Sequence, residues 1–335
     1  MLAVPGKDCT VSTLISATDL VKDFPLRGSI FDVFSRDRMA VHAVDHVNLS
    51  IDEGEVLGLA GESGSGKSTT GRLLLRLVEP TSGRIEYRGR EITNLGAGEL
   101  TAFRSRAQVV FQDPNSSLSP RMTVGQAITH PLQIHRRGTP AERKERVLDL
   151  MEKVGLSPAE FLYRKYPHQL SGGQSQRVVI ARALVTQPDF LVADEPIAMA
   201  DVSVRALILQ LMRQLKEEMR LTYLFITHDL ATAKYLCDRV AVMYLGRIVE
   251  VAPRDQLFSR PHHPYTKALL AAVPVPDPLA RRDKNLPRGE IPSAISPPPG
   301  CHFHPRCPFA QPRCREARPP LREIAAGHFS ACVLD

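Results

Sequence analysis

The chain has 335 residues, of which 43% are hydrophobic and 24% are charged, and its formal net charge is +7. These values are ordinary for a globular protein and leave room for one large domain and a smaller one. They exclude a membrane-spanning class, because no run approaches the ~18 apolar residues of a membrane helix, and the first residues lack the pattern of an export signal, so we expect a cytosolic location.

Strand-like apolar runs recur along the chain and alternate with segments of helical spacing. The expected strands, in chain order, are 13–24, 40–52, 55–60, 83–92 (a hairpin turning at Arg88–Gly89), 107–112, 190–196, 221–229 and 239–252 (a hairpin turning near Gly246). Helical spacing occurs over 68–80, ending at Pro80, and over most of 113–188. This alternation predicts an α/β fold with a largely parallel sheet.

The stretch GESGSGKSTT, from Gly61 to Thr70, lies between an expected buried strand and an expected helix. That is the context that a phosphate-binding loop requires. Its glycines let the backbone approach an anion, while loop N–H groups and the helix start face phosphate oxygens. Lys67 adds a charge near the β and γ phosphates, and the Ser68 hydroxyl is placed to ligate Mg²⁺. The expected nucleotide contacts in this loop are Gly61, Ser63, Gly64, Ser65, Gly66, Lys67, Ser68 and Thr69.

Polar residues end three other expected strands. Asp194 ends an apolar run and suits Mg²⁺ held through water, and Glu195 follows it, where it can deprotonate the attacking water. His228 is placed to contact the γ-phosphate, and Gln112 to sense metal and water. Each residue has a plainer interpretation as a surface or satisfied polar group, but their joint appearance at strand ends favours a catalytic site for Glu195, His228 and Gln112.

The stretch LSGGQSQR, residues 170–177, predicts a second anion-binding helix start in the same chain. One γ-phosphate does not need two such helix starts from one subunit. A head-to-tail pair of subunits would use both, with each ATP lying between one chain's residues 61–69 and the partner's residues 171–173.

These motifs, in this order, resemble those of the ATP-binding cassette (ABC) ATPases over roughly residues 13–272. The resemblance implies a P-loop NTPase cassette with a RecA-like core, an antiparallel β subdomain and an α-helical subdomain. The implied division is a cassette over 1–272, with its helical subdomain at about 113–188, and a proline-rich linker with a small cysteine module over 273–335. It also implies an ATP sandwich dimer that closes on ATP and reopens after hydrolysis.

Further residues receive roles only through this resemblance. Phe24 would stack on adenine, and the second helix start would contact the partner's nucleotide. In place of a segment such as TSALD, the chain has IAMAD over residues 197–201, which retains Asp201 but puts standard contacts across the dimer in doubt. The implied nucleotide contacts outside the loop are Phe24, Ser171, Gly172, Gly173, Gln174 and Asp201.

Three further stretches resemble the oligopeptide/dipeptide/nickel importer branch: residues 111–128, residues 262–274 and the cysteine-bearing end. The insertion between Phe24 and Val41 is similar to the second ATPase subunit type of that branch. The implied function is ATP-driven import of peptides, or alternatively of nickel or another small solute. The implied partners are a second ATPase, two membrane permeases and, indirectly, an external binding protein, with this chain peripheral at the cytoplasmic face of the membrane.

A rival interpretation is a soluble ABC ATPase that acts on nucleic acid. The excess of basic residues is diffuse, and the sequence has no stripe of basic and aromatic residues. We therefore expect no nucleic-acid partner.

Four cysteines crowd into the last 35 residues, at Cys301, Cys307, Cys314 and Cys332. Such a cluster in a cytosolic protein indicates metal binding more often than disulfides. The spacings fit neither the usual zinc pair nor the common ferredoxin patterns, so spacing leaves zinc and an iron–sulfur cluster open. The branch resemblance favours a [4Fe-4S] cluster.

Overall fold

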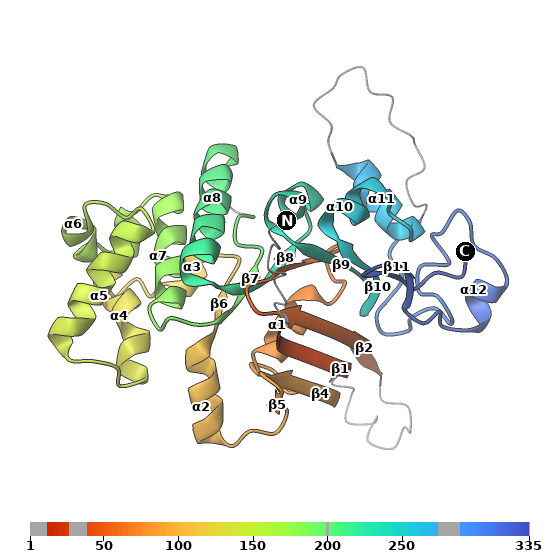
Figure 1. Cartoon of the computed structure of the whole chain (residues 1–335), viewed down its shortest axis with the longest axis horizontal. Helices are drawn as coiled ribbons and strands as arrows, with labels where there is room; N and C mark the ends of the chain where they lie inside the picture. The colour runs from red at the N-terminus through yellow and green to blue at the C-terminus, as the bar shows by residue number, and fades with distance from the viewer. Residues whose placement is uncertain (1–11, 27–38, 199–200, 274–288, 335) are drawn as a thin grey trace, which may run out of the picture.

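The computed structural model describes residues 12–26, 39–198, 201–273 and 289–334. A central eight-stranded sheet has the strand order β11-β12-β10-β9-β3-β8-β7-β6 (Figure 1). Its strands are β3 (Val56–Ala60), β6 (Ala107–Val110), β7 (Phe190–Asp194), β8 (Thr222–Thr227), β9 (Arg239–Tyr244), β10 (Arg247–Pro253), β11 (Arg322–Ala325) and β12 (His328–Ser330).

The five strands β9, β3, β8, β7 and β6 of this sheet run parallel. Every residue of β3, β7 and β8 is buried, as expected for apolar strands covered on both faces. Parallel strands end at the same edge of a sheet, so the loop after β3 and the residues after β6, β7 and β8 lie near one another. The α/β class and the parallel core predicted from the sequence are confirmed.

A second, antiparallel sheet has the order β2-β1-β4-β5 and packs an apolar core against the first. The expected hairpin is present, with Arg88 and Gly89 at φ values of 51° and 73°, which suit a two-residue turn. Most of the predicted insertion after Phe24 lies outside the described residues. The strands are β1 (Thr13–Pro25), β2 (Ala40–Asp52), β4 (Ser82–Tyr87) and β5 (Arg90–Glu91).

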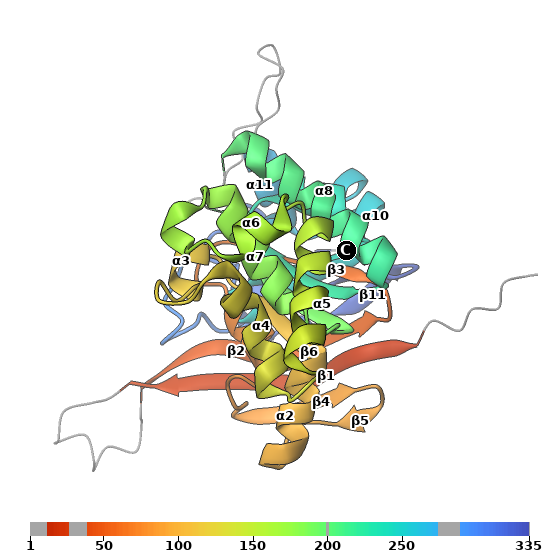
Figure 2. The same cartoon turned by 90° about the vertical axis from the view of Figure 1, so that its left-hand side faces the viewer.

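The predicted helical subdomain forms a lobe at one end of the molecule, at the far side of the sheet from the C-terminal segment (Figures 1 and 2). Its elements are α3 (Pro114–Ser117), α4 (Val124–Ile134), α5 (Pro140–Lys153), α6 (Ala159–Tyr163), the 3-10 turn η2 (Pro167–Gln169) and α7 (Gly172–Leu184). The other helices are α1 (Lys67–Leu74), α2 (Ala97–Arg106), α8 (Val202–Met219), α9 (Leu230–Leu236), α10 (Arg254–Ser259), α11 (Pro264–Ala272) and α12 (Arg313–Glu316).

Helix α1 is shorter than predicted, since the apolar spacing had indicated a helix that continues up to Pro80. It ends at Leu74 because Arg76 takes a left-handed conformation, with φ 53°. The Arg76 N–H then bonds the Leu73 carbonyl, and the Leu77 N–H bonds the Arg72 carbonyl. These two bonds form a Schellman end, which needs no glycine when a polar residue accepts the conformation.

The C-terminal segment joins the central sheet, which the sequence did not indicate. Strand β12 pairs antiparallel with β10, with Ser330 opposite Glu250. Phe303 is buried in the same core as the sheet and packs against Tyr244 and Tyr265. The division of the chain at residue 272 stays a prediction. No helix within the described ranges is both long enough and apolar enough to cross a membrane.

Candidate active site

The loop between β3 and α1 has the backbone of a phosphate cradle. Gly64 and Gly66 have φ values of 75° and 104°, which side chains disfavour. A Cβ on Gly66 would lie 2.1 Å from the Ala43 carbonyl oxygen, and one on Gly61 would lie 2.2 Å from the Met243 carbonyl oxygen. Gly66 is the N-cap of α1 and no side chain caps that helix. The first N–H groups of α1 therefore stay open for an anion.

The ammonium group of Lys67 is held inside this loop. Its Nζ donates to the Gly61 carbonyl at 2.8 Å and to the Glu62 carbonyl at 2.7 Å. Burial lowers the pKa of Lys67, while the nearby carboxylates of Glu195 and Asp194 act in the opposite direction. The loop thus combines a buried cation with open helix donors, and this donor set fits a polyphosphate.

The Ser68 hydroxyl donates to Asp194 Oδ1 at 2.8 Å, across the gap between α1 and β7. Burial is the main cause that raises the pKa of Asp194, and its hydrogen bond from Ser68 opposes the rise. A hydroxyl and a carboxylate oxygen are hard ligands of the kind that Mg²⁺ takes. The two side chains therefore fit the predicted magnesium site.

Glu195 lies between the two other predicted catalytic residues. Its Oε2 accepts from Gln112 Nε2 at 3.2 Å, and its Oε1 lies 3.2 Å from His228 Nδ1. Glu195 has φ 48°, an uncommon backbone conformation for a residue other than glycine, and its N–H bonds the Ile226 carbonyl. The structure brings together the three side chains that the sequence placed at separate strand ends. Their catalytic roles stay predictions.

Phe24 is the second-last residue of β1 and pairs with Val41 of β2. Two residues further along β2, the Ala43 carbonyl approaches Gly66 of the phosphate loop. Phe24 is 39% exposed, and Lys22 Nζ lies 5.0 Å from the centre of its ring. An exposed ring on a strand that borders the loop suits a base-stacking role, which stays a prediction.

The second predicted anion site begins α7. Ser171 Oγ accepts from the Gln174 N–H at 3.2 Å, and Gln174 Oε1 accepts from the Ser171 N–H at 3.0 Å. This closed capping box satisfies donors of α7 within the chain. In the part of the chain that the structure describes, no hydrogen bond joins residues 171–174 to residues 61–69. Within the described residues, the two predicted halves of an ATP site are therefore not hydrogen-bonded to each other.

Asp201 caps α8, because its Oδ1 accepts from the Val204 N–H at 2.8 Å. In the altered segment before it, Ile197 is buried and the Ala198 N–H bonds the Glu195 carbonyl. Residues 199–200 lie outside the described residues. A capping role accounts for Asp201 in one chain, and its predicted contact with nucleotide stays untested.

The four C-terminal cysteines line one small pocket, and they are Cys301, Cys307, Cys314 and Cys332. Burial, and then the three neighbouring thiols, raise the pKa of Cys301 to about 11. Across the described ranges, however, no group of three or more His, Cys, Asp or Glu is arranged to hold a metal ion. The thiols converge on one pocket but form no ready metal site there, and the predicted iron–sulfur or zinc site stays a prediction.

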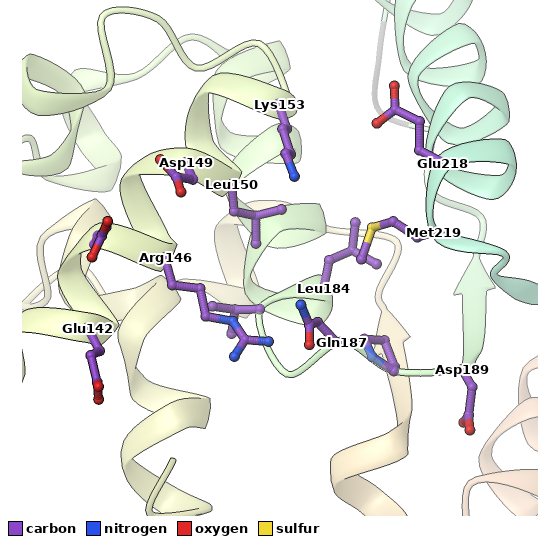
Figure 3. Close-up of a pocket in the computed structure, with 13 residues that line it drawn as sticks. Glu142, Arg146, Asp149, Leu150, Lys153, Leu184, Gln187, Asp189, Glu218 and Met219 are labelled. Carbon is purple, nitrogen blue, oxygen red and sulfur yellow. The ribbon is translucent and has the colours of Figure 1, made fainter. Parts of the chain in front are cut away.

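A wider cavity of about 690 Å³ lies away from these residues (Figure 3). Arg146 and Lys153 of α5 form part of one wall, and Glu218 and Met219 at the end of α8 form part of another. Asp189, which precedes β7, also lines it. The cavity thus lies at the amino end of β7, whereas Asp194 ends that strand and Glu195 follows it. None of the predicted site residues lines the cavity.

The sequence did not indicate the roles of three residues around the phosphate loop, which are Glu62, Tyr265 and Arg306. Glu62 is an unspecified position of the loop motif, yet its N–H donates to Tyr265 Oη at 2.8 Å. Its carboxylate pairs with Arg306 of the C-terminal segment. No local pattern links these residues, because each partner lies more than 200 positions along the chain from Glu62.

Comparison with known proteins agrees with this site. Residues 44–198 match the family model described as ABC transporter, and residues 249–314 match the one described as oligopeptide/dipeptide transporter, C-terminal region. The chain belongs to the family of ATP-binding subunits of ABC transporters. It is an ATPase of that class, and its last part is that of the oligopeptide/dipeptide branch.

Individual relatives match most of the chain. A Brucella ovis protein, provisionally named as a peptide import ATP-binding protein, is 48% identical over 97% of this chain and 99% of its own length. The oligopeptide transport ATP-binding protein AppF of Bacillus subtilis is 46% identical over 96% of this chain and 97% of its own length. Among solved structures, the dimeric ATP-binding cassette MJ0796, in a post-hydrolysis state bound to ADP and Pi, has a TM-score of 0.63 and 31% identity, covering 72% of this chain and 99% of that one.

Proposed function

We propose that this chain binds and hydrolyses ATP to drive an ABC importer that carries peptides across the cytoplasmic membrane. The single observation that carries the hydrolytic role is the Glu195 carboxylate, held between Gln112 and His228 beside the Ser68–Asp194 pair. The peptide cargo is supported by the match of residues 249–314 and by the names of the relatives.

In this proposal the chain's own residues divide the work. The phosphates would lie against the open N–H groups at the start of α1 and against Lys67. A Mg²⁺ ion held by Ser68, Gln112 and Asp194 would neutralise charge on the phosphate oxygens. Glu195 accepts the proton of the attacking water, and His228 orients the Glu195 carboxylate.

The proposal extends to partners. A second, non-identical ATPase would pair head to tail with this chain, so that each ATP meets one phosphate loop and the other chain's α7. Two helix starts of different construction, which no hydrogen bond joins within the described residues, support this arrangement. Two membrane permeases and, indirectly, an external binding protein would complete the transporter, with this chain peripheral at the cytoplasmic face of the membrane.

The test is Glu195→Gln in the assembled transporter, reconstituted in lipid vesicles. A general base contributes about 10²- to 10⁴-fold to a rate, so ATP turnover should fall by at least about 10²-fold while ATP affinity is kept. Peptide uptake should stop as well. Turnover at the parent rate would show that Glu195 is not the base. If the parent transporter takes up nickel but not peptide in an ATP-driven manner, the proposed peptide cargo is wrong.

We also propose that the four cysteines hold an iron–sulfur cluster, with zinc as the alternative. Their convergence on one pocket supports this, as do the Gln311 N–H directed at Cys314 Sγ and the Leu334 N–H directed at Cys332 Sγ, both at 3.4 Å. The side chains would still have to close around the group, since they form no ready metal site. The test measures the iron, sulfide and zinc contents of the anaerobically purified protein and of Cys314→Ala. Iron with sulfide would indicate the cluster, and zinc would indicate the alternative. Absence of all three would reject both proposals.

A further inference from the structure

The C-terminal segment contacts the phosphate loop through a partly buried ion pair. Arg306 Nη1 donates to Glu62 Oε2 at 2.7 Å, and Nη2 donates to Glu62 Oε1 at 3.1 Å. The Arg306 side chain is 9% exposed and that of Glu62 is 27% exposed. Two parallel bonds between a guanidinium and a carboxylate fix the orientation as well as the distance of the pair.

Glu62 is held at three points, and one of them is the lysine of the loop. Its N–H donates to Tyr265 Oη, its carbonyl accepts from Lys67 Nζ, and its carboxylate accepts from Arg306. The carboxylate that Arg306 holds and the carbonyl that holds Lys67 therefore belong to the same residue. Supporting contacts of this kind set how accurately a binding group is placed.

Arg306 is itself fixed by the core. Its N–H bonds the carbonyl of Phe303, whose ring is buried against Tyr244 and Tyr265. The guanidinium carbon lies 5.8 Å from the centre of the Tyr244 ring. Desolvation offsets most of the Coulombic gain of a buried ion pair, so such a pair adds little net stability. Its contribution here is the position that it gives to Glu62.

We propose that Arg306 is a positioning residue for the phosphate loop: acting through Glu62, it holds the loop and Lys67 in the arrangement that binds ATP. The C-terminal segment is then part of the ATP site's support within the same subunit. This inference rests on the proposed ATP site.

The test measures the equilibrium affinity of the full-length chain for ATP with Mg²⁺ in three variants: Arg306→Gln, Glu62→Gln and the double variant. Loss of a hydrogen bond to a charged group predicts that each single change weakens affinity about tenfold. The double variant should be no weaker than a single one, because both changes remove the same contact. Exchanging the charges, with Glu62→Arg and Arg306→Glu together, should restore part of the affinity.

Two controls separate this role from general stability. Arg313 lies in the same segment, and its Nε bonds Gln311 Oε1 at 2.9 Å, so Arg313→Gln should leave ATP affinity unchanged. The thermal midpoint without nucleotide is recorded for every variant. A fall in midpoint with parent-like affinity would overturn the proposal, as would additive losses in the double variant.

The inference and the proposed function fail in different ways. If the parent chain does not bind ATP, or if Lys67→Ala binds it equally well, the proposed ATP site is wrong. If the parent binds ATP and Glu62→Gln binds it equally well, only the role of Arg306 is wrong. If Arg306→Gln fails to fold, the Glu62→Gln variant alone tests the proposal, because this substitution keeps the backbone contacts of residue 62.

Discussion

The starts of α1 and α7 look alike in sequence but differ in structure. Both carry glycines and hydroxyl residues before a helix, and both were predicted to bind an anion. Helix α1 begins at Gly66 in a left-handed conformation with no side-chain cap, whereas α7 begins with a closed capping box between Ser171 and Gln174. One helix start leaves its donors open, and the other satisfies part of its own.

This difference indicates two different tasks. The open start of α1, with a buried lysine in its first turn, requires an anion to complete it. The start of α7 satisfies part of its donors through its own capping box, and Ser171 and Gly172 are exposed. A glycine motif before a helix therefore does not by itself tell whether a chain binds phosphate alone or only with a partner.

The largest expected effect comes from changing a glycine at the start of α1. Gly66→Ala places a Cβ 2.1 Å from the Ala43 carbonyl oxygen at a positive φ, whereas Gly64→Ala meets nothing within 4 Å. We expect Gly66→Ala to lower the free energy of unfolding by about 3 kcal/mol, from left-handed strain and overpacking together. Gly64→Ala should cost about 1 kcal/mol. Equal losses in urea unfolding would show that the loop does not have this shape.

Lys67 gives the next largest effect. Removing a charged donor from a phosphate site costs up to about 3 kcal/mol, so Lys67→Ala should weaken ATP affinity of the chain alone about a hundredfold. Ser171→Ala, measured in the same titration, should leave this affinity unchanged. A similar loss for both variants would mean that one chain uses both helix starts.

The smallest effect concerns the capping box itself. Ser171→Ala removes the side chain that accepts from the Gln174 N–H, and loss of such a cap costs about 1 kcal/mol of stability. Ser171→Asp keeps an acceptor and should retain the stability, while its charge would repel a partner's phosphate. Chemical unfolding measures the first effect and ATP-dependent pairing the second. Normal pairing of Ser171→Asp would contradict the task assigned to α7.

The sequence predicted the active-site edge because the signals there are local. Gln112, Asp194 and His228 each lie at the end of an apolar strand or within two residues after it, and parallel pairing then brings those ends together. The end of α1 was misjudged because Arg76 adopts a conformation that its residue type does not announce. Local patterns are enough where one segment determines its own position.

The contacts of the C-terminal segment could not be predicted from local sequence patterns. Strand β12 has three residues, too few for an alternating pattern, and it pairs with a strand some eighty residues earlier. The Arg306–Glu62 pair joins residues 244 positions apart. Cysteine spacing announced a cluster, and the thiols do converge, but spacing did not specify a ligand geometry. Contacts of this kind depend on the folded whole.

The most direct test of the central claim is a structure of the assembled transporter that carries Glu195→Gln, trapped with ATP and Mg²⁺. We expect Ser171 of this chain to lie within hydrogen-bond distance, about 3 Å, of the γ-phosphate on the partner's phosphate loop. If the trapped complex binds ATP on residues 61–69 and Ser171 remains remote from every phosphate, the two-chain site is wrong.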